Sequence, residues 1–330
     1  MKPTPASVGI IATGSYVPPR VLTNFDLEKM VDTSDEWIRT RTGIEQRRIA
    51  DADTATSDLA LRSARNALDA AGLQPSDIGL LIVATVTPDM FFPSTAALLQ
   101  QALGALNAPA FDLLVGCTGF IYGLAIARDL VACGSYQRVL LTAAETLSKI
   151  TDWQDRSTCV LFGDAAGSAM VARVPEGHGI LSYSLGNDGT NAEALRIPAG
   201  GSRLPASAET VANRQHYLQM VGSEVFKFAV RAMVDSCEEA VSRAGLTMDH
   251  IEVVIPHQAN LRIMDAAAKR LNLPLDRFVR NVDRYGNTSA ASIPLALDEE
   301  VRAGRIQAGD HVLLSSFGAG LSWASMVMRW

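Results

Sequence analysis

The sequence predicts an α/β protein built from two pseudo-symmetric halves, and three observations lead to that prediction. Segments that read as helix, glycine turn and strand recur at a constant separation along the chain, as in a duplicated unit. Strands such as "GLLIVAT" are apolar at every position, which is typical of strands covered by helices on both faces. The uncharged run from Leu113 to Ala127 is too short to span a membrane and indicates a buried central helix.

The two halves are predicted at residues 1–172 and 173–330. The segment "ARNALDAAGLQPSDIGLLIVAT" matches "CEEAVSRAGLTMDHIEVVIPHQ" with Gly72 against Gly245, and "RVLLTAA" matches "HVLLSSF" at the same separation. Between these blocks the register slips, and "VACG" faces "VRAG" at a shorter separation. In that register we expect Asn287 to occupy in the second half the place that Cys117 occupies in the first.

The elements follow from local patterns along the chain. Each repeated block reads as a helix ended by glycine, a short turn and an apolar strand. "VLFGDAAGSAMVA" and "SFGAGLSWASMVM" predict a glycine-containing hairpin that closes each half. Residues 183–217, rich in Gly, Asn, Ser and Pro, have no counterpart in the first half. They form either a loop beside the functional site or a plain surface insertion.

Composition excludes several classes of protein. With 48% hydrophobic and 19% charged residues the chain is not disordered, and a net charge of −6 does not suggest a nucleic-acid partner. The four cysteines are scattered without a CxxC pair, so we expect neither a disulfide framework nor a metal site. No secretory signal is recognisable, and we expect a cytoplasmic protein without membrane contact.

Cys117 lies where an irregular stretch gives way to the helical segment "TGFIYGLAIARDLVACG". The positive end of the helix dipole and free backbone N–H groups favour a thiolate at such a position, which predicts a nucleophile. A buried packing cysteine is the alternative, and we expect the other three cysteines to be of that kind.

Two polar residues of the second half are further candidates. His257 ends the strand "IEVVIPH", at the carboxyl end where open α/β sheets bind ligands, although a structural histidine is equally compatible. Asn287 follows a glycine turn in "RYGNTSAASIPLAL", where asparagine is usually a local cap. We expect the remaining histidines on the surface: His178, His216, His250 and His311.

Together the three candidates fit one reaction class. A cysteine can carry an acyl thioester, while a neutral histidine and an asparagine amide can donate hydrogen bonds to an oxyanion or an enolate. No carboxylate base is required if the carbanion arises by decarboxylation. The glycine-rich "SFGAGLSW" would bring backbone N–H groups close to the thiol.

Over nearly its whole length the chain resembles the β-ketoacyl-acyl-carrier-protein synthase III family. The matching motifs are "TSDEWIRTRTGI", "GCTGF", "FGDAAG", "GSEVFKFAV", "PHQANLRI", "GNTSAASIPLALDE" and "FGAGLSW". The resemblance implies a thiolase-like fold with layered mixed sheets. It also implies an acyltransferase that condenses an acyl-CoA primer, acetyl-CoA or another short one, with malonyl-acyl carrier protein to initiate fatty-acid synthesis. The coenzyme A thioester is then a substrate, and no cofactor is expected.

The resemblance assigns roles to the candidates. It implies that Cys117 carries the acyl group, and that His257 and Asn287 stabilise the enolate formed when the malonyl group loses CO2. The backbone N–H groups of Cys117 and Ala319 would hold the oxyanion of the condensation step. Ala319 departs from the all-glycine turn of some members, but only its N–H is required.

The resemblance also implies where coenzyme A binds. Trp37 and Arg156 would sandwich the adenine. The channel would be lined by Arg41, Gly222, Phe226, Ala259 and Asn260. The basic run "RTRTGIEQRR" could meet the phosphates, or could be only a solvated face.

Two expectations concern protein partners. Acyl carrier proteins are acidic, so an acidic enzyme needs a local basic patch to receive one. The candidates for this patch are Lys227, Gln258, Arg262, Lys269 and Arg270, of which Arg262 and the last two share one side of a helix. The resemblance further implies a homodimer in which Phe92 crosses the interface and limits the acyl pocket.

Competing interpretations are separated by single residues. Thiolases use a second cysteine near the C-terminus, and here none follows Cys237. Elongating ketosynthases have a longer chain with two active-site histidines, and this chain has Asn287 in place of the second histidine. Chalcone-synthase-like enzymes share the cysteine, histidine and asparagine, but their chain is longer and the sequences beside these residues differ. A synthase III-like acyltransferase or starter enzyme of a secondary-metabolite pathway stays open. So does a non-catalytic scaffold, although such proteins lack the cysteine.

Overall fold

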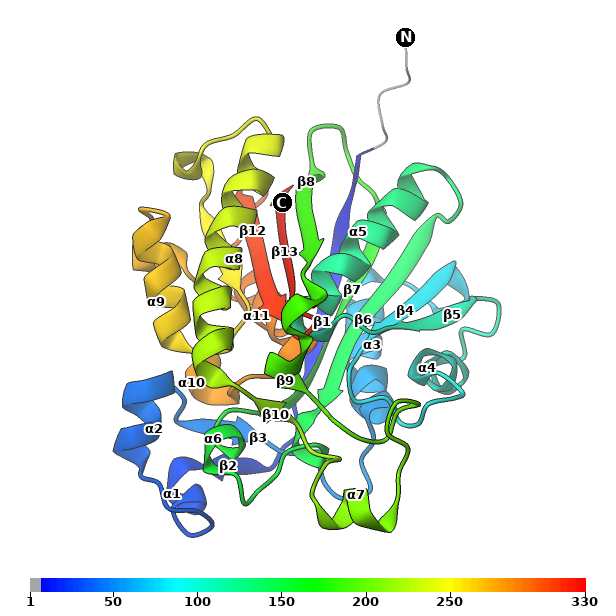
Figure 1. Ribbon diagram of the computed structural model, residues 1–330. Helices are drawn as coiled ribbons and strands as arrows, with labels where there is room; N and C mark the ends of the chain where they lie inside the picture. The colour runs from blue at the N-terminus through cyan, green and yellow to red at the C-terminus, as the bar shows by residue number, and fades with distance from the viewer. Residues whose placement is uncertain (1–6) are drawn as a thin grey trace.

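The computed structural model describes residues 7–330 and is centred on two mixed sheets with helices between and outside them (Figure 1). The first sheet has the strand order β1-β7-β6-β4-β5 and the second β11-β12-β13-β8. In each sheet the strands at one end run parallel, β6 with β4 and β5 in the first and β11 with β12 in the second. The other strands pair antiparallel. The layered mixed sheets therefore confirm the predicted fold class.

The first half supplies one sheet and its helices. Its elements are β1 (Val8–Tyr16), α3 (Thr56–Ala71), η1 (Pro75–Asp77), β4 (Leu80–Ala84), α4 (Thr95–Leu103), β5 (Ala110–Leu113), η2 (Gly116–Thr118), α5 (Gly119–Ala132), β6 (Arg138–Thr146) and β7 (Asp164–Arg173), where η marks a 3₁₀ turn. The second half supplies β8 (Gly179–Asn187), α8 (Gly222–Arg243), η5 (Met248–His250), β11 (Val253–Pro256), α9 (Leu261–Arg270), η6 (Leu275–Arg277), α10 (Val282–Tyr285), η7 (Ser289–Ala291), α11 (Ser292–Arg302), β12 (His311–Gly318) and β13 (Ser322–Arg329).

The two halves run through the same elements in the same order. The series β1-α3-β4-α4-β5-η2-α5-β6-β7 is matched by β8-α8-β11-α9-η7-α11-β12-β13. A parallel bridge between Val254 and Phe278 stands where the first half has the pairing of β4 with β5. The division expected between residues 172 and 173 falls at the last residue of β7.

The core is deepest between the sheets, where α5 and α11 pack (Figure 1). Leu124 of α5 and Leu297 of α11 are fully buried, together with Ile82 of the first sheet and Leu314 of the second. Helices α3 and α4 cover the outer face of the first sheet, and α8 and α9 that of the second. The uncharged run is thus a buried central helix from Gly119 onward, as predicted, whereas its first six residues form the end of β5, a partly exposed connection and η2. Among residues 7–330 no helix is both long and apolar enough to cross a membrane.

The structure corrects the register expected between the halves. Turns η2 and η7 begin at the same separation as the repeated helix, turn and strand blocks, and so do α5 and α11. Ala290 therefore takes the place of Cys117, and the expectation for Asn287 is wrong. The shorter separation further along arises because α11 has 11 residues and α5 has 14, so the helix ends differ by almost one turn. Gly116 and Ser289, which start the two turns, both have positive φ, 57° and 48°.

Three insertions lie below the two sheets in Figure 1. The first comprises β2 (Val21–Thr23), α1 (Asn24–Leu27), α2 (Asp35–Thr42) and β3 (Gln46–Arg48), and the second η3 (Leu147–Lys149) and α6 (Arg156–Cys159). The third comprises η4 (Gly189–Ala194), β9 (Leu195–Arg196), α7 (Ala208–Ala212) and β10 (Gln219–Met220). The hairpin predicted for the second half is confirmed in β12–β13. The one predicted in "VLFGDAAGSAMVA" is wrong, because the second insertion separates β7 from its partner β6.

Candidate active site

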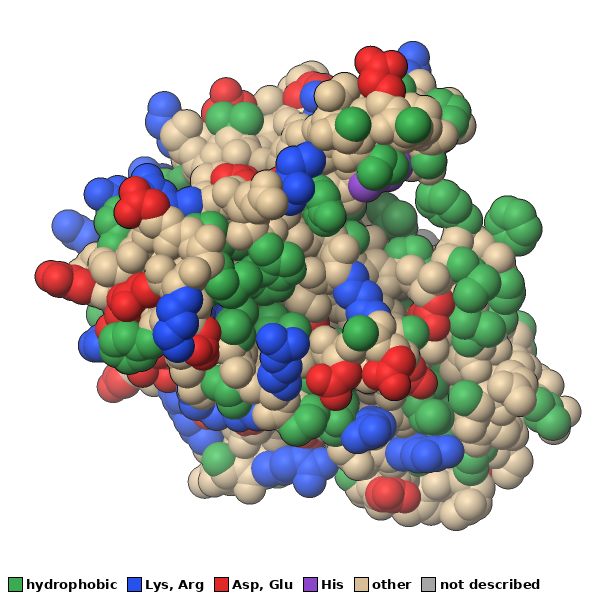
Figure 2. All heavy atoms as spheres, turned by 90° about the horizontal axis from the view of Figure 1, so that it is seen from below, with side chains coloured by type: hydrophobic (Ala, Val, Ile, Leu, Met, Phe, Trp, Pro, Cys, Tyr) green, Lys and Arg blue, Asp and Glu red, His purple; other side chains and the backbone are tan. Residues whose placement is uncertain are grey.

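A cavity of about 1260 Å³ opens at the carboxyl ends of β4 and β11, between the sheets and the insertions. Its wall includes residues of all three insertions and of η2, η7 and the β12–β13 turn. Figure 2 views the face that carries the insertions, where hydrophobic side chains and Lys and Arg side chains lie together. The cavity exceeds the usual volume of a site for a small ligand, about 300–1000 Å³, so it can hold a long one.

Cys117 lies at the middle of η2 and borders this cavity, directly before the 14-residue helix α5. The β12–β13 turn packs against its backbone, and an added Cβ on Gly318 would lie 2.7 Å from the Cys117 nitrogen. An added Cβ on Gly116 would lie 3.1 Å from the Ala319 nitrogen. The two glycines therefore allow the backbone N–H groups of Cys117 and Ala319 to lie side by side.

The Cys117 side chain is half-buried and borders the cavity. Burial raises the pKa of the thiol to about 12, against an opposing influence from the Ser289 hydroxyl. The nearby charge of Glu145 raises it further. The resting residue is therefore a thiol at neutral pH, and it must lose a proton to act as a nucleophile.

His257 follows β11 directly, as expected, and is 1% exposed. Its Nδ1 lies 2.7 Å from the Ser292 Oγ, which also accepts the Gln258 N–H at 3.4 Å. The Ser292 oxygen has two lone pairs, so the donor in this contact depends on the ring tautomer, and in the Nε2–H tautomer the Ser292 O–H donates to Nδ1. Burial lowers the pKa of His257 to about 3, so the ring is a neutral hydrogen-bond donor.

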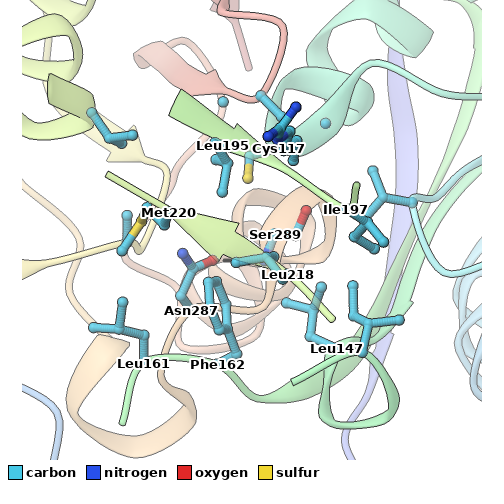
Figure 3. Close-up of a pocket in the computed structure, with 18 of the residues that line it drawn as sticks. Cys117, Leu147, Leu161, Phe162, Leu195, Ile197, Leu218, Met220, Asn287 and Ser289 are labelled. Atoms are coloured by element: carbon cyan, nitrogen blue, oxygen red, sulfur yellow. Dashed lines mark hydrogen bonds between the residues drawn. The ribbon is translucent and has the colours of Figure 1, made fainter. Parts of the chain in front are cut away.

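Asn287 is held by its backbone and by its own side-chain oxygen. Its N–H donates to the Leu161 carbonyl at 2.8 Å, and its carbonyl accepts from Gly163 at 3.0 Å. Its Oδ1 accepts the Ser289 N–H at 2.9 Å, which fixes the amide orientation. The Nδ2 group is therefore the one free to donate, and Figure 3 shows Cys117, Ser289 and Asn287 around one space.

The wall around the thiol is mainly apolar. Figure 3 shows these side chains, which are Leu147, Leu161, Phe162, Leu195, Ile197, Leu218 and Met220. Four of them come from residues 195–220, so this excursion lies beside the site rather than on a plain surface. Its predicted start is wrong, because residues 183–187 belong to β8, the counterpart of β1. His216 also lines the cavity, against our expectation of a surface position, because this segment folds back on it. The apolar residues of "ALRI" and "YLQM" were the available signal.

Most of the expected coenzyme A residues line the cavity: Trp37, Arg41, Gly222, Phe226, Ala259 and Asn260. Arg156 is not among the described residues of its wall. The guanidinium of Arg156 lies 5.2 Å from the centre of the Trp37 ring, and that of Arg41 lies 5.5 Å from it. A flat ring between two partners needs about 7 Å, twice a contact distance, so the expected sandwich requires Arg156 to withdraw.

The expected docking residues divide into three groups. Lys227 and Arg262 are exposed and border the cavity, and Lys269 and Arg270 are exposed at the far end of α9, about 10 Å along the helix. The expectation for Gln258 is wrong, because this residue is 1% exposed. Its amide is used inside the protein, donating to two carbonyls and accepting two backbone N–H groups.

The structure also shows where Phe92 and the other three cysteines lie. Phe92 is 85% exposed and is not among the described residues of the cavity wall, which include its neighbour Phe91. Cys159 and Cys237 are buried, but Cys133 is exposed at the end of α5, so the core expectation for it is wrong. Within residues 7–330 no group of His, Cys, Asp and Glu is arranged to hold a metal ion.

Comparison with known proteins places this geometry among condensing enzymes. Residues 111–189 match the family model of 3-oxoacyl-[acyl-carrier-protein] synthase III, and residues 241–330 match that of its C-terminal part. The chain is 60% identical to a β-ketoacyl-[acyl-carrier-protein] synthase III of Caldanaerobacter subterraneus over 98% of both chains.

Solved structures agree with the sequence relatives. The synthase III of Thermus thermophilus is 54% identical, with a TM-score of 0.91 over 98% of this chain and 99% of that one. A priming β-ketosynthase of the R1128 polyketide pathway is 37% identical, with a TM-score of 0.92 over 100% of this chain and 98% of that one. The cavity with Cys117, His257 and Asn287 thus lies in a fold that both enzymes share.

Proposed function

This chain belongs to the β-ketoacyl-[acyl-carrier-protein] synthase III family of acyltransferases, and from that premise we propose how its own residues carry out the reaction. An acyl-CoA primer acylates Cys117, and malonyl-acyl carrier protein then condenses with the acyl group to initiate fatty-acid synthesis. One observation carries the proposal: a cysteine at a helix N-terminus shares a cavity with a neutral histidine and with an asparagine whose side-chain oxygen already accepts a backbone N–H.

In the first half-reaction the Cys117 thiol gives up its proton as its sulfur attacks the acyl carbon, and the coenzyme A sulfur leaves and takes up a proton. The positive end of α5 stabilises developing negative charge on the sulfur. The backbone N–H groups of Cys117 and Ala319 form the oxyanion hole for the tetrahedral intermediate. Ala319 serves as well as glycine here, because its N–H rather than its side chain is used.

In the second half-reaction the malonyl thioester oxygen lies between His257 Nε2 and Asn287 Nδ2. As the carboxylate leaves as CO2, its electron pair forms an enolate, and both N–H groups hydrogen-bond to the developing oxyanion. The enolate carbon then attacks the Cys117 acyl carbon, and the Cys117 sulfur leaves. His257 stays neutral throughout, because burial holds its pKa at about 3.

The substrates enter by the face with the insertions. We propose that Trp37, Arg41, Gly222, Phe226, Ala259 and Asn260 line the coenzyme A channel, and that Arg156 closes on the adenine after leaving its present place over Trp37. The coenzyme A thioester is a substrate, and we expect no cofactor. The primer is acetyl-CoA or another short acyl-CoA.

Carrier protein would approach over the rim of the same cavity. Lys227 and Arg262 stand at this rim and offer positive charge to an acidic partner, whereas the chain as a whole carries a net charge of −6. Lys269 and Arg270 extend the charge along α9. We therefore assign the first contact to Arg262 and Lys227.

A homodimer is the expected assembly. β5 is the edge strand of the first sheet, and large apolar side chains near it are exposed: Phe91 82%, Phe92 85%, Leu106 70%, Phe111 38% and Leu114 72%. Such an apolar surface on a monomer usually marks an interface. Since Phe92 is not part of its own cavity wall, we propose that it reaches the acyl pocket of the partner subunit. The free cysteines suit the reducing cytoplasm, where we place the enzyme.

The test is mass spectrometry of the intact protein after incubation with a panel of acyl-CoAs, followed by malonyl-acyl carrier protein. We expect an adduct at Cys117 that malonyl-carrier protein discharges as a β-ketoacyl product, and no adduct in Cys117→Ala. His257→Ala and Asn287→Ala should acylate but not condense. If both condensed at the wild-type rate, the roles proposed here would be wrong.

A starter enzyme or acyltransferase of a secondary-metabolite pathway is the second candidate, and the 37% identity to the R1128 priming β-ketosynthase supports the starter enzyme. The same experiment separates a condensing enzyme from an acyltransferase that does not condense. An adduct that forms but is not discharged by malonyl-carrier protein favours the acyltransferase. Absence of any adduct with any primer would favour a non-catalytic scaffold.

A further inference from the structure

A carboxyl group that the reaction above does not use lies behind the nucleophile. Glu145 of β6 is fully buried and is not among the described residues of the cavity wall. Its Oε2 accepts from Thr87 at 2.7 Å, Thr85 at 3.2 Å and the Val86 N–H at 3.1 Å, whereas its Oε1 accepts only that N–H, at 3.3 Å. One oxygen of a buried carboxyl group therefore keeps room for another donor.

Ser289 belongs to η7, which contacts both η2, the turn of Cys117, and β6, the strand of Glu145. Its Oγ is buried and has no hydrogen-bond partner among residues 7–330, which is costly for a hydroxyl. Burial raises the pKa of both Cys117 and Glu145, and the Ser289 hydroxyl opposes that rise for each of them. The single Ser289 hydroxyl proton can be donated to only one of these two groups at a time.

The backbone conformation at Ser289 is unusual for a residue that carries a side chain. Ser289 has φ 48°, in the left-handed region that favours glycine. The equivalent position of the first half, Gly116, is a glycine with φ 57°. The second half therefore has a serine at a backbone conformation that glycine adopts with less strain. We infer that the Ser289 hydroxyl group has a functional role that offsets this strain.

We propose that Ser289 relays the Cys117 proton to Glu145 during acylation. As the Cys117 sulfur bonds to the acyl carbon, its proton moves to the Ser289 Oγ and the Ser289 proton moves to the Glu145 carboxylate. When the bond to the coenzyme A sulfur breaks, the protons return along the same path and the leaving thiolate receives one. No proton is gained or lost, and Glu145 acts through Ser289 as a positioning residue.

The acid strength of Glu145 suits this task. Burial raises its pKa to about 7, so near neutral pH it is partly ionised and can accept and return a proton. The alternative is that Glu145 acts on Cys117 by its charge alone. These two roles predict opposite results for Glu145→Gln, since removal of a nearby negative charge would make the thiol more acidic.

The experiment measures alkylation of Cys117 by iodoacetamide against pH, with the site of modification mapped by mass spectrometry. All variants carry Cys133→Ser, because Cys133 is the exposed cysteine of the described chain. We expect the parent rate to rise with an inflection near the Glu145 pKa of about 7. Glu145→Gln and Ser289→Ala should remove the inflection and slow alkylation at neutral pH by about tenfold or more. Without the relay the rate follows the thiolate fraction of Cys117, which falls tenfold for each pH unit below the pKa of the thiol.

Asp164→Asn is the matched control, because Asp164 is a buried carboxyl group on the neighbouring strand β7 whose pKa is also raised by burial. It should keep the parent profile. Faster alkylation of Glu145→Gln, or an inflection that persists in Ser289→Ala, would overturn the relay. Ser289→Gly also removes the hydroxyl, and glycine adopts this backbone conformation without strain. If Ser289→Ala misfolds, Ser289→Gly therefore still tests the relay.

The inference rests on the proposed function for its role in acylation, and a second measurement joins the two. The rate of acylation by the preferred acyl-CoA should fall in parallel with alkylation in both variants. If the variants were alkylated more slowly but acylated at the parent rate, the relay would have no role in acylation. If the parent protein accepted no acyl-CoA, the proposed function would fail while the alkylation profiles still decided whether the relay exists.

Discussion

Replacement of Asn287 by aspartate tests the enolate site with the smallest change of shape. The Asn287 Oδ1 accepts the Ser289 N–H at 2.9 Å, and an aspartate oxygen can keep that bond. The other oxygen then replaces the Nδ2 donor by an acceptor at the place where enolate charge develops. Loss of one such donor costs about 3–4 kcal/mol of transition-state stabilisation, or roughly a hundredfold to a thousandfold in rate.

The ionised aspartate adds repulsion to the lost donor. Two negative charges about 4 Å apart repel by about 4 kcal/mol at an effective dielectric constant of 20. Condensation by Asn287→Asp should therefore be slower than by Asn287→Ala while the carboxyl group is ionised. Because residue 287 is 8% exposed, burial raises the pKa of an introduced carboxyl group, and its protonated form regains an O–H donor as the pH falls.

The assay is a single turnover in which pre-acylated enzyme is mixed with malonyl-acyl carrier protein at several pH values. Asn287→Asp should condense faster at lower pH, relative to the parent, whereas Asn287→Ala should show no such recovery. Acylation of Cys117 should be retained in both variants. Condensation by Asn287→Asp within about threefold of the parent rate at alkaline pH would refute the assignment of Nδ2 as a donor.

Three further changes test other parts of the site. Ser292→Ala removes the hydroxyl that we propose donates to His257 Nδ1 and favours the Nε2–H tautomer, worth about 1 kcal/mol, so condensation should slow about fivefold while acylation stays the same in single-turnover assays. Gly318→Ala places a Cβ 2.7 Å from the Cys117 nitrogen and should slow acylation at least about tenfold, as a misplaced oxyanion donor does. Arg262→Glu should raise the KM for malonyl-carrier protein far more than that for acyl-CoA, with Arg65→Glu on α3, outside the docking patch, as the charge-matched control, and equal effects on both substrates would remove the docking assignment.

The sequence predicts the architecture well because its signals are local. The repeated helix, glycine and strand blocks, and the uninterrupted apolar strand Leu80–Ala84, are readable within windows of about 20 residues and map onto the observed sheets. The positions of Cys117 at a helix start and His257 at a strand end follow from the same patterns. The register across the halves failed because α11 is shorter than α5, a difference that neither helix shows by itself.

The contacts of individual side chains could not be predicted from local sequence patterns. Gln258 follows His257 in a motif beside the site, but its amide is consumed by backbone groups from Pro256 to Val282 that only the tertiary fold brings together. Arg156 lies over Trp37, an arrangement between two separate insertions. Glu145 reads as the polar end of a strand, and its place behind the thiol depends on the pairing of β6 with β4.

The duplicated fold explains how an asymmetric site arises from two similar halves. Each half brings a 3₁₀ turn and the start of a central helix to the carboxyl ends of its parallel strands, and the two turns, η2 and η7, lie in contact. The first turn begins with glycine and carries the cysteine, while the second begins with Ser289 and carries Ala290 in the cysteine's place. A second thiol there would compete for the same acyl group, whereas a small side chain leaves room for the donors beside it. In the mechanism proposed above, η7 supports the nucleophile, with Asn287 before it to hold the enolate and Ser289 to move the proton.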